Sequence, residues 1–188
     1  RSLGFSEMVT EARDGAVWPG RADGPPALAR TEAMPDDTLD IEARVRTIVH
    51  DVLDRDGWER KADEIEKLFG PVHILVSNAG VGRLPNVIAG TLKDWDWGMG
   101  VNFWGPLCGA RTFVPRMLAH KEGSHIVTTT STDGVLLGTA GIYAVTKMAV
   151  SGLMEQLRHE LRATNIGTSN LVPGMTSTNL GRSESEYR

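Results

Sequence analysis

The sequence has little of what marks several large classes of protein. Its 188 residues include one cysteine, Cys108, which excludes an internal disulfide and a cysteine-rich metal site and favours a reducing, cytoplasmic location. No apolar stretch approaches the ~20 residues that a membrane-spanning helix requires. The basic residues are scattered and the formal net charge is −4, so no surface is expected to follow a phosphate backbone. We therefore expect no nucleic acid, no membrane and no metal as partners.

What remains is the composition of a globular domain. Hydrophobic residues make up 40% of the chain and charged residues 23%, which is enough apolar material for the core of one domain. We expect a single domain over residues 1–188. Residues 1–43 are rich in Pro, Gly, Ala and Arg and show no clear period, so we expect them to be mostly irregular, with one short helix at about 27–33.

Short β-branched or apolar runs alternate with segments of helical period from residue 44 onward. The runs predict strands at 44–52, 71–80, 124–131 and 167–174. The segments between them predict helices at 54–70, 91–120 and 142–163. This alternation indicates parallel pairing with right-handed crossovers, so we expect an α/β fold whose sheet is covered by helices on both faces.

Residues with binding or catalytic chemistry follow each predicted strand. In open parallel sheets, ligands bind beyond the carboxyl ends of the strands. The residues at those ends are Asp51, Asn78–Gly80, Ser131 and Pro173–Gly174. Because all four strands end this way, we expect a binding site along that edge.

Tyr143 and Lys147 lie four positions apart in the last predicted helix, and therefore on one face of it. A phenol has a pKa near ~10 and is a poor base at neutral pH. A fixed ammonium within one helical turn would lower that pKa and bring proton transfer into range. The alternative is a half-buried tyrosine beside a solvated lysine.

Ser131 ends a Thr-rich strand twelve residues before Tyr143, a distance that a short loop can fold back across. A hydroxyl beside a phenol can hold a substrate oxygen while the tyrosine exchanges its proton. The alternatives are that Ser131 only terminates the strand, or that Thr130 takes this role.

Asn102 lies in a predicted helix that also contains Gly98, Gly100, Gly105, Pro106 and Pro115. Pro106 has no N–H, so the α-helical hydrogen bond to the carbonyl of Asn102 cannot form. A freed carbonyl could hold a water molecule in a proton relay, and local violations of this kind tend to mark functional sites. The alternatives are an ordinary kink or two helices that meet at Gly105.

Together these residues resemble the short-chain dehydrogenase/reductase family, over roughly residues 45–181. The resemblance rests on ordered motifs: "DV" at 51–52, "NAG" at 78–80, "VN" at 101–102, Ser131, the Tyr143–Lys147 pair and "PGMTST" at 173–178. The segments "FVPRML" and "HIVTTTS" and the 142–163 helix resemble the branch that oxidises benzylic secondary alcohols in lignin-type aromatics. The resemblance implies a Rossmann-like, doubly wound parallel sheet.

The resemblance also implies a function, the interconversion of a secondary alcohol and a ketone with NAD or NADP. Tyr143 would be the general acid/base, and Lys147 would lower its pKa and bind the nicotinamide ribose. Ser131 would orient the substrate oxygen, and the main-chain carbonyl of Asn102 would hold a relay water. The other implied cofactor contacts are Asp51 and Val52 at the adenine, Asn78, Ala79 and Gly80 near the ribose, and Pro173, Gly174, Thr176 and Thr178 at the nicotinamide.

The sequence departs from the family's pattern near both ends. The family's glycine-rich turn, which receives the cofactor pyrophosphate, has only a weak counterpart in "PGRADGPP" at 19–26, where prolines replace a threonine and a glycine. The chain stops at "GRSESEYR", where family members continue. We therefore expect a sheet that is incomplete at both ends, and the alternative function is a non-catalytic relative that acts through its oligomer interface.

The predicted helices at 91–120 and 142–163 carry more large apolar side chains than one core face needs. In the family these helices form a dimer contact, so the resemblance implies a homodimer or homotetramer; the alternative is that the tryptophans pack within one chain. The side chains concerned are Trp95, Trp97, Trp104, Met148 and Met154.

Overall fold

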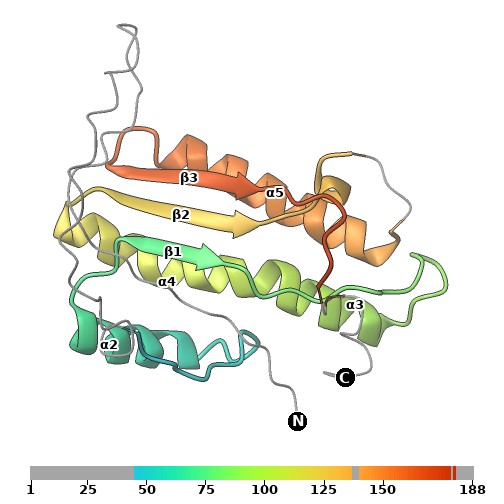
Figure 1. The fold of residues 1–188 in the computed structure, drawn as a ribbon, viewed down its shortest axis with the longest axis horizontal. Coiled ribbons are helices and arrows are strands. Elements are labelled where there is room, and N and C mark those ends of the chain that lie inside the picture. The colour runs from blue at the N-terminus through green and yellow to red at the C-terminus, as the bar shows by residue number, and fades with distance from the viewer. Residues whose placement is uncertain (1–44, 137–139, 179, 181–188) are drawn as a thin grey trace, which may run out of the picture. The chain divides into compact units, whose positions relative to one another are not determined.

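The structure is a computed structural model that describes residues 45–136, 140–178 and 180. The described residues from Ile48 onward belong to one compact unit. Figure 1 labels its main helices and strands. In chain order, the elements are α2 (Gly57–Phe69), β1 (Ile74–Ser77), α3 (Leu92–Met99), the π-helical turn η1 (Gly100–Trp104), α4 (Gly105–His120), β2 (Ser124–Thr129), the 3-10 turn η2 (Thr132–Gly134), α5 (Ile142–Glu160) and β3 (Ile166–Leu171).

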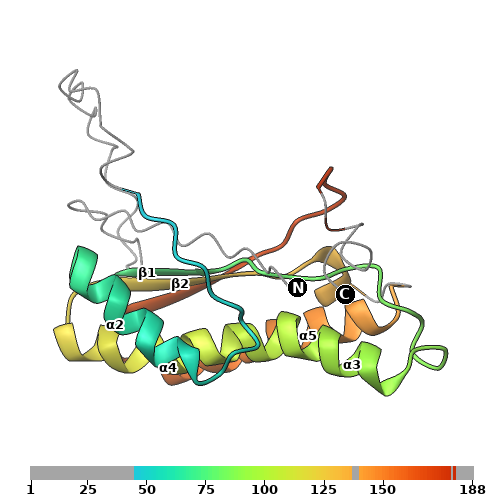
Figure 2. The same cartoon turned by 90° about the horizontal axis from the view of Figure 1, so that it is seen from below.

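The three strands form one parallel sheet in the order β1-β2-β3, which confirms the predicted α/β class with parallel pairing. Leu75 of β1 pairs with Ile126 of β2, which in turn pairs with Thr168 of β3. Within the described residues, the helices α2, α3, α4 and α5 all lie on one side of this sheet (Figure 2). The structure thus contains one covered face of a Rossmann-like arrangement.

The core lies between that face of the sheet and the helices. Strand β2 alternates buried and half-buried residues, so Ile126 and Thr128 point into the core. Phe113 and Met117 of α4 fill the space between the layers, and each such buried side chain contributes about 1.5–3 kcal/mol. Met154 of α5 lies in this core as well, where its sulfur accepts a hydrogen bond from the Thr128 hydroxyl at 3.1 Å. Its assignment to a surplus, interface-forming set was therefore wrong.

The predicted strand at 44–52 is wrong over residues 45–52, which form no strand. The β-branched residues there satisfy a local preference, but a strand also needs a neighbour with which to exchange backbone hydrogen bonds. The described strands pair only among themselves. Val49 is accordingly 65% exposed instead of packed against a sheet.

One guanidinium forms hydrogen bonds and ion pairs between helices α2 and α4. Arg116 of α4 donates to Glu59, Asp63 and Glu66 of α2, with N···O distances of 2.7, 2.7 and 2.6 Å. These carboxylates recur at spacings of four and three, which places them on one face of α2. Gly70, with φ of 80°, then ends the helix as the sequence predicts.

The region from Leu92 to His120 is helical throughout, but its hydrogen-bonding pattern changes in the middle. Thr91 begins α3 with a capping box in which its hydroxyl accepts from the amide of Asp94. At η1 the amide of Gly105 bonds the carbonyl of Gly100, five residues back. Gly105 also lies against Val52, whose Cβ would be 3.1 Å from an added Cβ. The predicted interruption is thus a π-turn, a feature frequent at functional sites.

Candidate active site

The candidate site lies at the carboxyl edge of the sheet, as the sequence predicts. Ser131 follows β2, and the amide of Thr132 donates to the carbonyl of Pro173 after β3 at 3.2 Å. On the other side, the Thr129 hydroxyl donates to Asn78 Oδ1 after β1 at 2.7 Å. The segments after all three strands are therefore joined by hydrogen bonds.

Tyr143 and Ser131 are brought together at this edge. Ser131 is buried at the start of η2, where its Oγ accepts from the amide of Asp133 at 3.2 Å. Tyr143 is half-buried in the first turn of α5, and its phenol lies close enough to the Ser131 side chain for that hydroxyl to lower its pKa. Ser131 is thus the hydroxyl at the phenol, whereas the Thr130 hydroxyl donates to the carbonyl of Leu171 at 3.1 Å.

Gly141 fixes where α5 begins, and sequence reasoning missed it. Its φ is 58°, and a Cβ at this position would lie 2.5 Å from the Pro85 carbonyl oxygen. The next amide, of Ile142, donates to that same oxygen at 3.1 Å. This close approach sets the position of Tyr143, and an isolated glycine before a helical segment was the one available signal.

Burial raises the pKa of Tyr143, and the negative charge of Asp133 raises it further, whereas the hydrogen bond with Ser131 lowers it. The prediction that Lys147 lowers this pKa is not confirmed. The Lys147 ammonium lies 5.8 Å from the centre of the tyrosine ring and donates to the Thr129 carbonyl at 2.9 Å. Desolvation of the phenol therefore outweighs the opposing effect of Ser131, and Asp133 acts in the same direction as desolvation.

Lys147 is a buried cation at the centre of the site. It is 4% exposed, and burial lowers its pKa to about 8. An ammonium has three N–H donors, and among the described residues one of them bonds Thr129. A Cβ on Gly80 would lie 3.5 Å from Nζ, so the absence of a side chain there keeps the ammonium approachable. Lys147 thus fits a hydroxyl-bearing ligand such as a cofactor ribose.

Asn102 is buried in η1, where its side chain joins two other segments. Its Oδ1 accepts from the amide of Val81 at 2.8 Å, and its Nδ2 donates to the Val81 carbonyl at 3.0 Å and to Thr146 Oγ1 at 2.9 Å. It therefore connects the loop after β1 to α5, one residue before Lys147. Sequence reasoning assigned Asn102 through its main-chain carbonyl and missed Val81 and Thr146.

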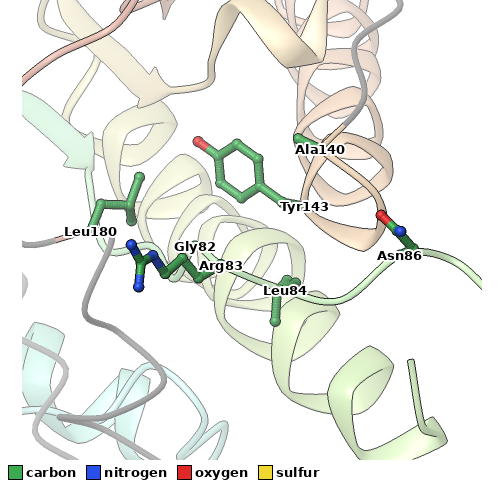
Figure 3. Close-up of a pocket in the computed structure, with 7 residues that line it drawn as sticks. All are labelled: Gly82, Arg83, Leu84, Asn86, Ala140, Tyr143 and Leu180. Atoms are coloured by element: carbon green, nitrogen blue, oxygen red, sulfur yellow. The ribbon is translucent and has the colours of Figure 1, made fainter. Parts of the chain in front are cut away.

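A pocket of about 230 Å³ opens beside Tyr143. Figure 3 shows the Tyr143 ring projecting from the start of α5 into the space between Ala140 on one side and Leu180 and Arg83 on the other. Arg83 is exposed and has a φ of 52°. Leu84, Ala140 and Leu180 thus give the pocket apolar walls, and Arg83 and Asn86 add a cation and an amide to its lining. The lining residues are Gly82, Arg83, Leu84, Asn86, Ala140, Tyr143 and Leu180.

The other predicted contacts fall into two groups. Val52 is buried and lines a second pocket together with Asn78 and Ala79, so these residues are brought together. Asp51 forms a turn next to it, in which Oδ1 accepts from the amide of Leu53 at 3.0 Å.

The residues after β3 make mainly local contacts. Gly174, Thr176 and Thr178 are exposed, and the two threonine hydroxyls bond Gly174 O and Leu180 N. The weak glycine-turn counterpart at 19–26 lies outside the described residues. No helix in the described part of the chain has both the length and the apolarity to cross a membrane.

Comparison with known proteins agrees with this arrangement. The sequence profile of the short chain dehydrogenase family matches residues 27–188. A C alpha-dehydrogenase of Sphingobium sp. (strain NBRC 103272 / SYK-6) is 38% identical over 159 residues, which cover 82% of this chain and 52% of that protein. 3beta-hydroxysteroid dehydrogenase 2 of Eggerthella lenta is 31% identical over 82% of this chain and 58% of its own length. The chain thus spans about half the length of these relatives.

The fold is shared with solved structures. A short chain dehydrogenase/reductase from Burkholderia phymatum, crystallised in complex with NAD, superimposes with a TM-score of 0.74 at 36% identity. The superposition covers 77% of this chain and 53% of that one. The parallel sheet, the Ser131–Tyr143 contact, the buried Lys147 and the profile match lead to one conclusion: the chain belongs to the short-chain dehydrogenase family.

Proposed function

We propose that the chain contains the catalytic centre of an NAD(P)-dependent oxidoreductase that interconverts a secondary alcohol and a ketone. The observation that carries this proposal is the proximity of the Ser131 and Tyr143 side chains, close enough for Ser131 to lower the pKa of the phenol, with the buried Lys147 four residues from Tyr143 at the carboxyl edge of a parallel sheet. A bound nicotinamide would supply or accept the hydride, and the protein would handle the proton.

Tyr143 is the proposed general acid and base. Its raised pKa keeps the phenol protonated at neutral pH, so it is ready to donate a proton to a ketone oxygen held by Ser131 Oγ. In the oxidation direction the phenol must first lose its proton. A nearby cation stabilises the phenolate, and Lys147 is the buried cation closest to it along α5.

Lys147 is also the proposed ribose ligand, since a buried ammonium with unused donors gains from hydroxyl acceptors. The proposed cofactor is NAD or NADP; the Burkholderia phymatum relative was crystallised with NAD. Val52, Asn78 and Ala79 would lie on the adenosine side of the cofactor, and Pro173 on its nicotinamide side. Two further residues, Asp51 and Gly80, are proposed contacts on the adenosine side. On the nicotinamide side the further proposed contacts are Gly174, Thr176 and Thr178.

The proposed substrate is a secondary alcohol with apolar substituents, and we consider benzylic alcohols the first class to test. Leu84, Ala140 and Leu180 provide apolar walls next to the phenol. A C alpha-dehydrogenase is among the relatives, which agrees with a carbon-bound hydroxyl as the reacting group.

Turnover by the full chain tests this function. Reduction of aryl methyl ketones with NADH and with NADPH is followed by nicotinamide absorbance, together with cofactor binding by fluorescence. Tyr143→Phe is expected to lower kcat by about 10²–10⁴-fold while cofactor binding persists. The matched control is Leu92→Ala, whose side chain is 81% exposed on α3. Cofactor binding without turnover by the wild-type chain would favour the non-catalytic alternative instead.

We further propose that α4 and α5 form a contact between copies of the chain, which gives a homodimer or homotetramer. Leu118 and Val145 are exposed on these helices at 43% and 39%. Trp104 has a partner within the chain, because the Arg55 guanidinium lies 4.2 Å from the centre of its ring. Light scattering is expected to give a multiple of 20.4 kDa, and a monomeric mass would contradict this contact.

A further inference from the structure

Three metal-ligating side chains meet at the amino edge of the sheet, opposite the active site. They are His73, directly before β1, His120 at the end of α4, and Glu122 in the turn before β2. Their ligand atoms all lie within 4.8 Å of one another. Sequence reasoning expected no metal because the chain has one cysteine. It did not detect this cluster, since His73 and His120 are 47 positions apart and no local pattern connects them.

A backbone hydrogen bond and side-chain contacts hold this cluster together. The amide of His125, at the start of β2, donates to the carbonyl of His73 at 2.8 Å, so the sheet ladder extends to the cluster. His73 Nε2 lies 2.7 Å from Glu122 Oε2, and the rings of His73 and His120 are 4.9 Å apart, centre to centre. The His73 side chain is 24% exposed and that of Glu122 is 63% exposed, so an ion can enter from solvent.

The hydrogen bonds of His120 define which of its nitrogens offers a lone pair. The Val72 carbonyl, 3.3 Å from Nε2, can only accept, so Nε2 carries the proton. The amide of Glu122, 3.1 Å from Nδ1, can only donate, so Nδ1 carries the lone pair, and a metal bound there would take the place of this amide hydrogen bond. An imidazole that donates one N–H to a backbone carbonyl is the arrangement that orients histidine ligands in metal sites.

We propose that His73, His120 and Glu122 bind a divalent transition metal of the Zn²⁺ class, with Nδ1 as the ligand atom of His120. Two imidazole nitrogens and one carboxylate oxygen are a ligand set that Zn²⁺ takes, with water completing the tetrahedron. At bond lengths of 2.0–2.2 Å, tetrahedral ligand atoms are about 3.3–3.6 Å apart, so small side-chain rotations suffice. The ion would displace the proton that His73 and Glu122 share.

The bound ion would join the start of β1 to the α4–β2 turn, and this role is independent of hydride transfer. A ligand that binds only the folded state stabilises that state by mass action. The site therefore predicts a rise in thermal stability with Zn²⁺ and none with Mg²⁺ or Ca²⁺, which prefer oxygen ligands.

Calorimetric titration of the full chain tests the site. The chain is purified without a polyhistidine tag, treated with chelator, and titrated with Zn²⁺, with Co²⁺ absorption as a second readout. One ion per chain is expected. His73→Ala and Glu122→Gln should each weaken binding by more than about tenfold. The control His159→Ala removes an exposed imidazole from α5 and should leave binding unchanged.

The proposal is overturned if no saturable binding occurs at millimolar Zn²⁺, or if both ligand variants bind as the wild type does. Circular dichroism of the metal-free proteins checks that the variants are folded. Should His73→Ala unfold, Glu122→Gln decides alone, because it keeps the volume of the side chain and removes only the charge.

Discussion

The charged side chains at the two ends of the sheet differ in their burial. At the carboxyl end, the Lys147 ammonium is 4% exposed and the nearby phenol is half-buried, so desolvation controls both pKa values. Toward the amino end, Arg116 bonds three carboxylates of α2, two of which are 64% and 70% exposed. Buried charge of the first kind costs stability and is typical of chemistry, whereas solvated ion pairs of the second kind fasten helices together.

Removal of the buried cation, Lys147, should have the largest effect on activity. Lys147→Met keeps the length of the side chain and removes its charge. We expect kcat to fall by at least about 10²-fold, the lower end of acid–base effects, while the protein remains as stable as the wild type or becomes more stable. Steady-state kinetics and thermal unfolding measure both quantities. A large loss of stability with intact turnover would mean that Lys147 is a structural residue.

The pH dependence of stability should reveal the same cation. Burial lowers the pKa of Lys147 from its usual 10.5 to about 8, so between these values the unfolded chain binds the proton more tightly than the folded chain does. The unfolding free energy attributable to Lys147 should therefore rise with pH across this window, by about 3 kcal/mol. Denaturant unfolding of the wild type and Lys147→Met at pH 7 and pH 10 isolates this contribution. A difference between the two proteins that does not change with pH would contradict it.

Two glycines of the α5 region offer a matched pair for the geometry of the site. Gly141→Ala forces a Cβ against the Pro85 carbonyl at a φ of 58°, and should cost about 1–3 kcal/mol and lower kcat by moving Tyr143. Gly152→Ala meets nothing within 4 Å in a helix interior, and should stabilise by about 0.5–1 kcal/mol. Equal effects at the two positions would show that backbone conformation does not position the tyrosine.

The solvated network should give the smallest effect. Arg116→Gln removes the cation shared by Glu59, Asp63 and Glu66, and we expect a loss of about 1 kcal/mol that shrinks at high salt, with kcat unchanged. Urea unfolding at low and high ionic strength measures it. A loss that is independent of salt would point to packing of the guanidinium instead of charge.

Sequence reasoning succeeded where one local pattern carries the information. The apolar runs before Asn78, Ser131 and Pro173 predicted strands β1, β2 and β3, although each observed strand is shorter than or shifted from its predicted bounds. The spacing of Tyr143 and Lys147 likewise placed both on α5. Apolar periodicity is a local property, and the alternation of strands with helices then predicts parallel pairing.

What failed depends on contacts between distant segments. The strand expected at 44–52 has no partner among the described strands, and no local pattern reveals whether a partner exists. The direction of the Tyr143 pKa shift is set by burial, which is a property of the packed chain. The side chain of Asn102 finds Val81 and Thr146, 21 and 44 positions away, so its partners could not be read from its neighbours.

The π-turn at Gly100–Trp104 has a consequence for how the protein tolerates change in length. It lets Asn102 reach the loop after β1 and α5 while Gly105, three residues on, lies against Val52. A deletion of one residue here would restore ordinary α-helical winding, which keeps the flanking helices nearly in phase but moves Asn102 away from Val81 and Thr146. A deletion should therefore be tolerated far less at this turn than in the exposed loop around Ile88, because here it removes the hydrogen bonds of a buried side chain.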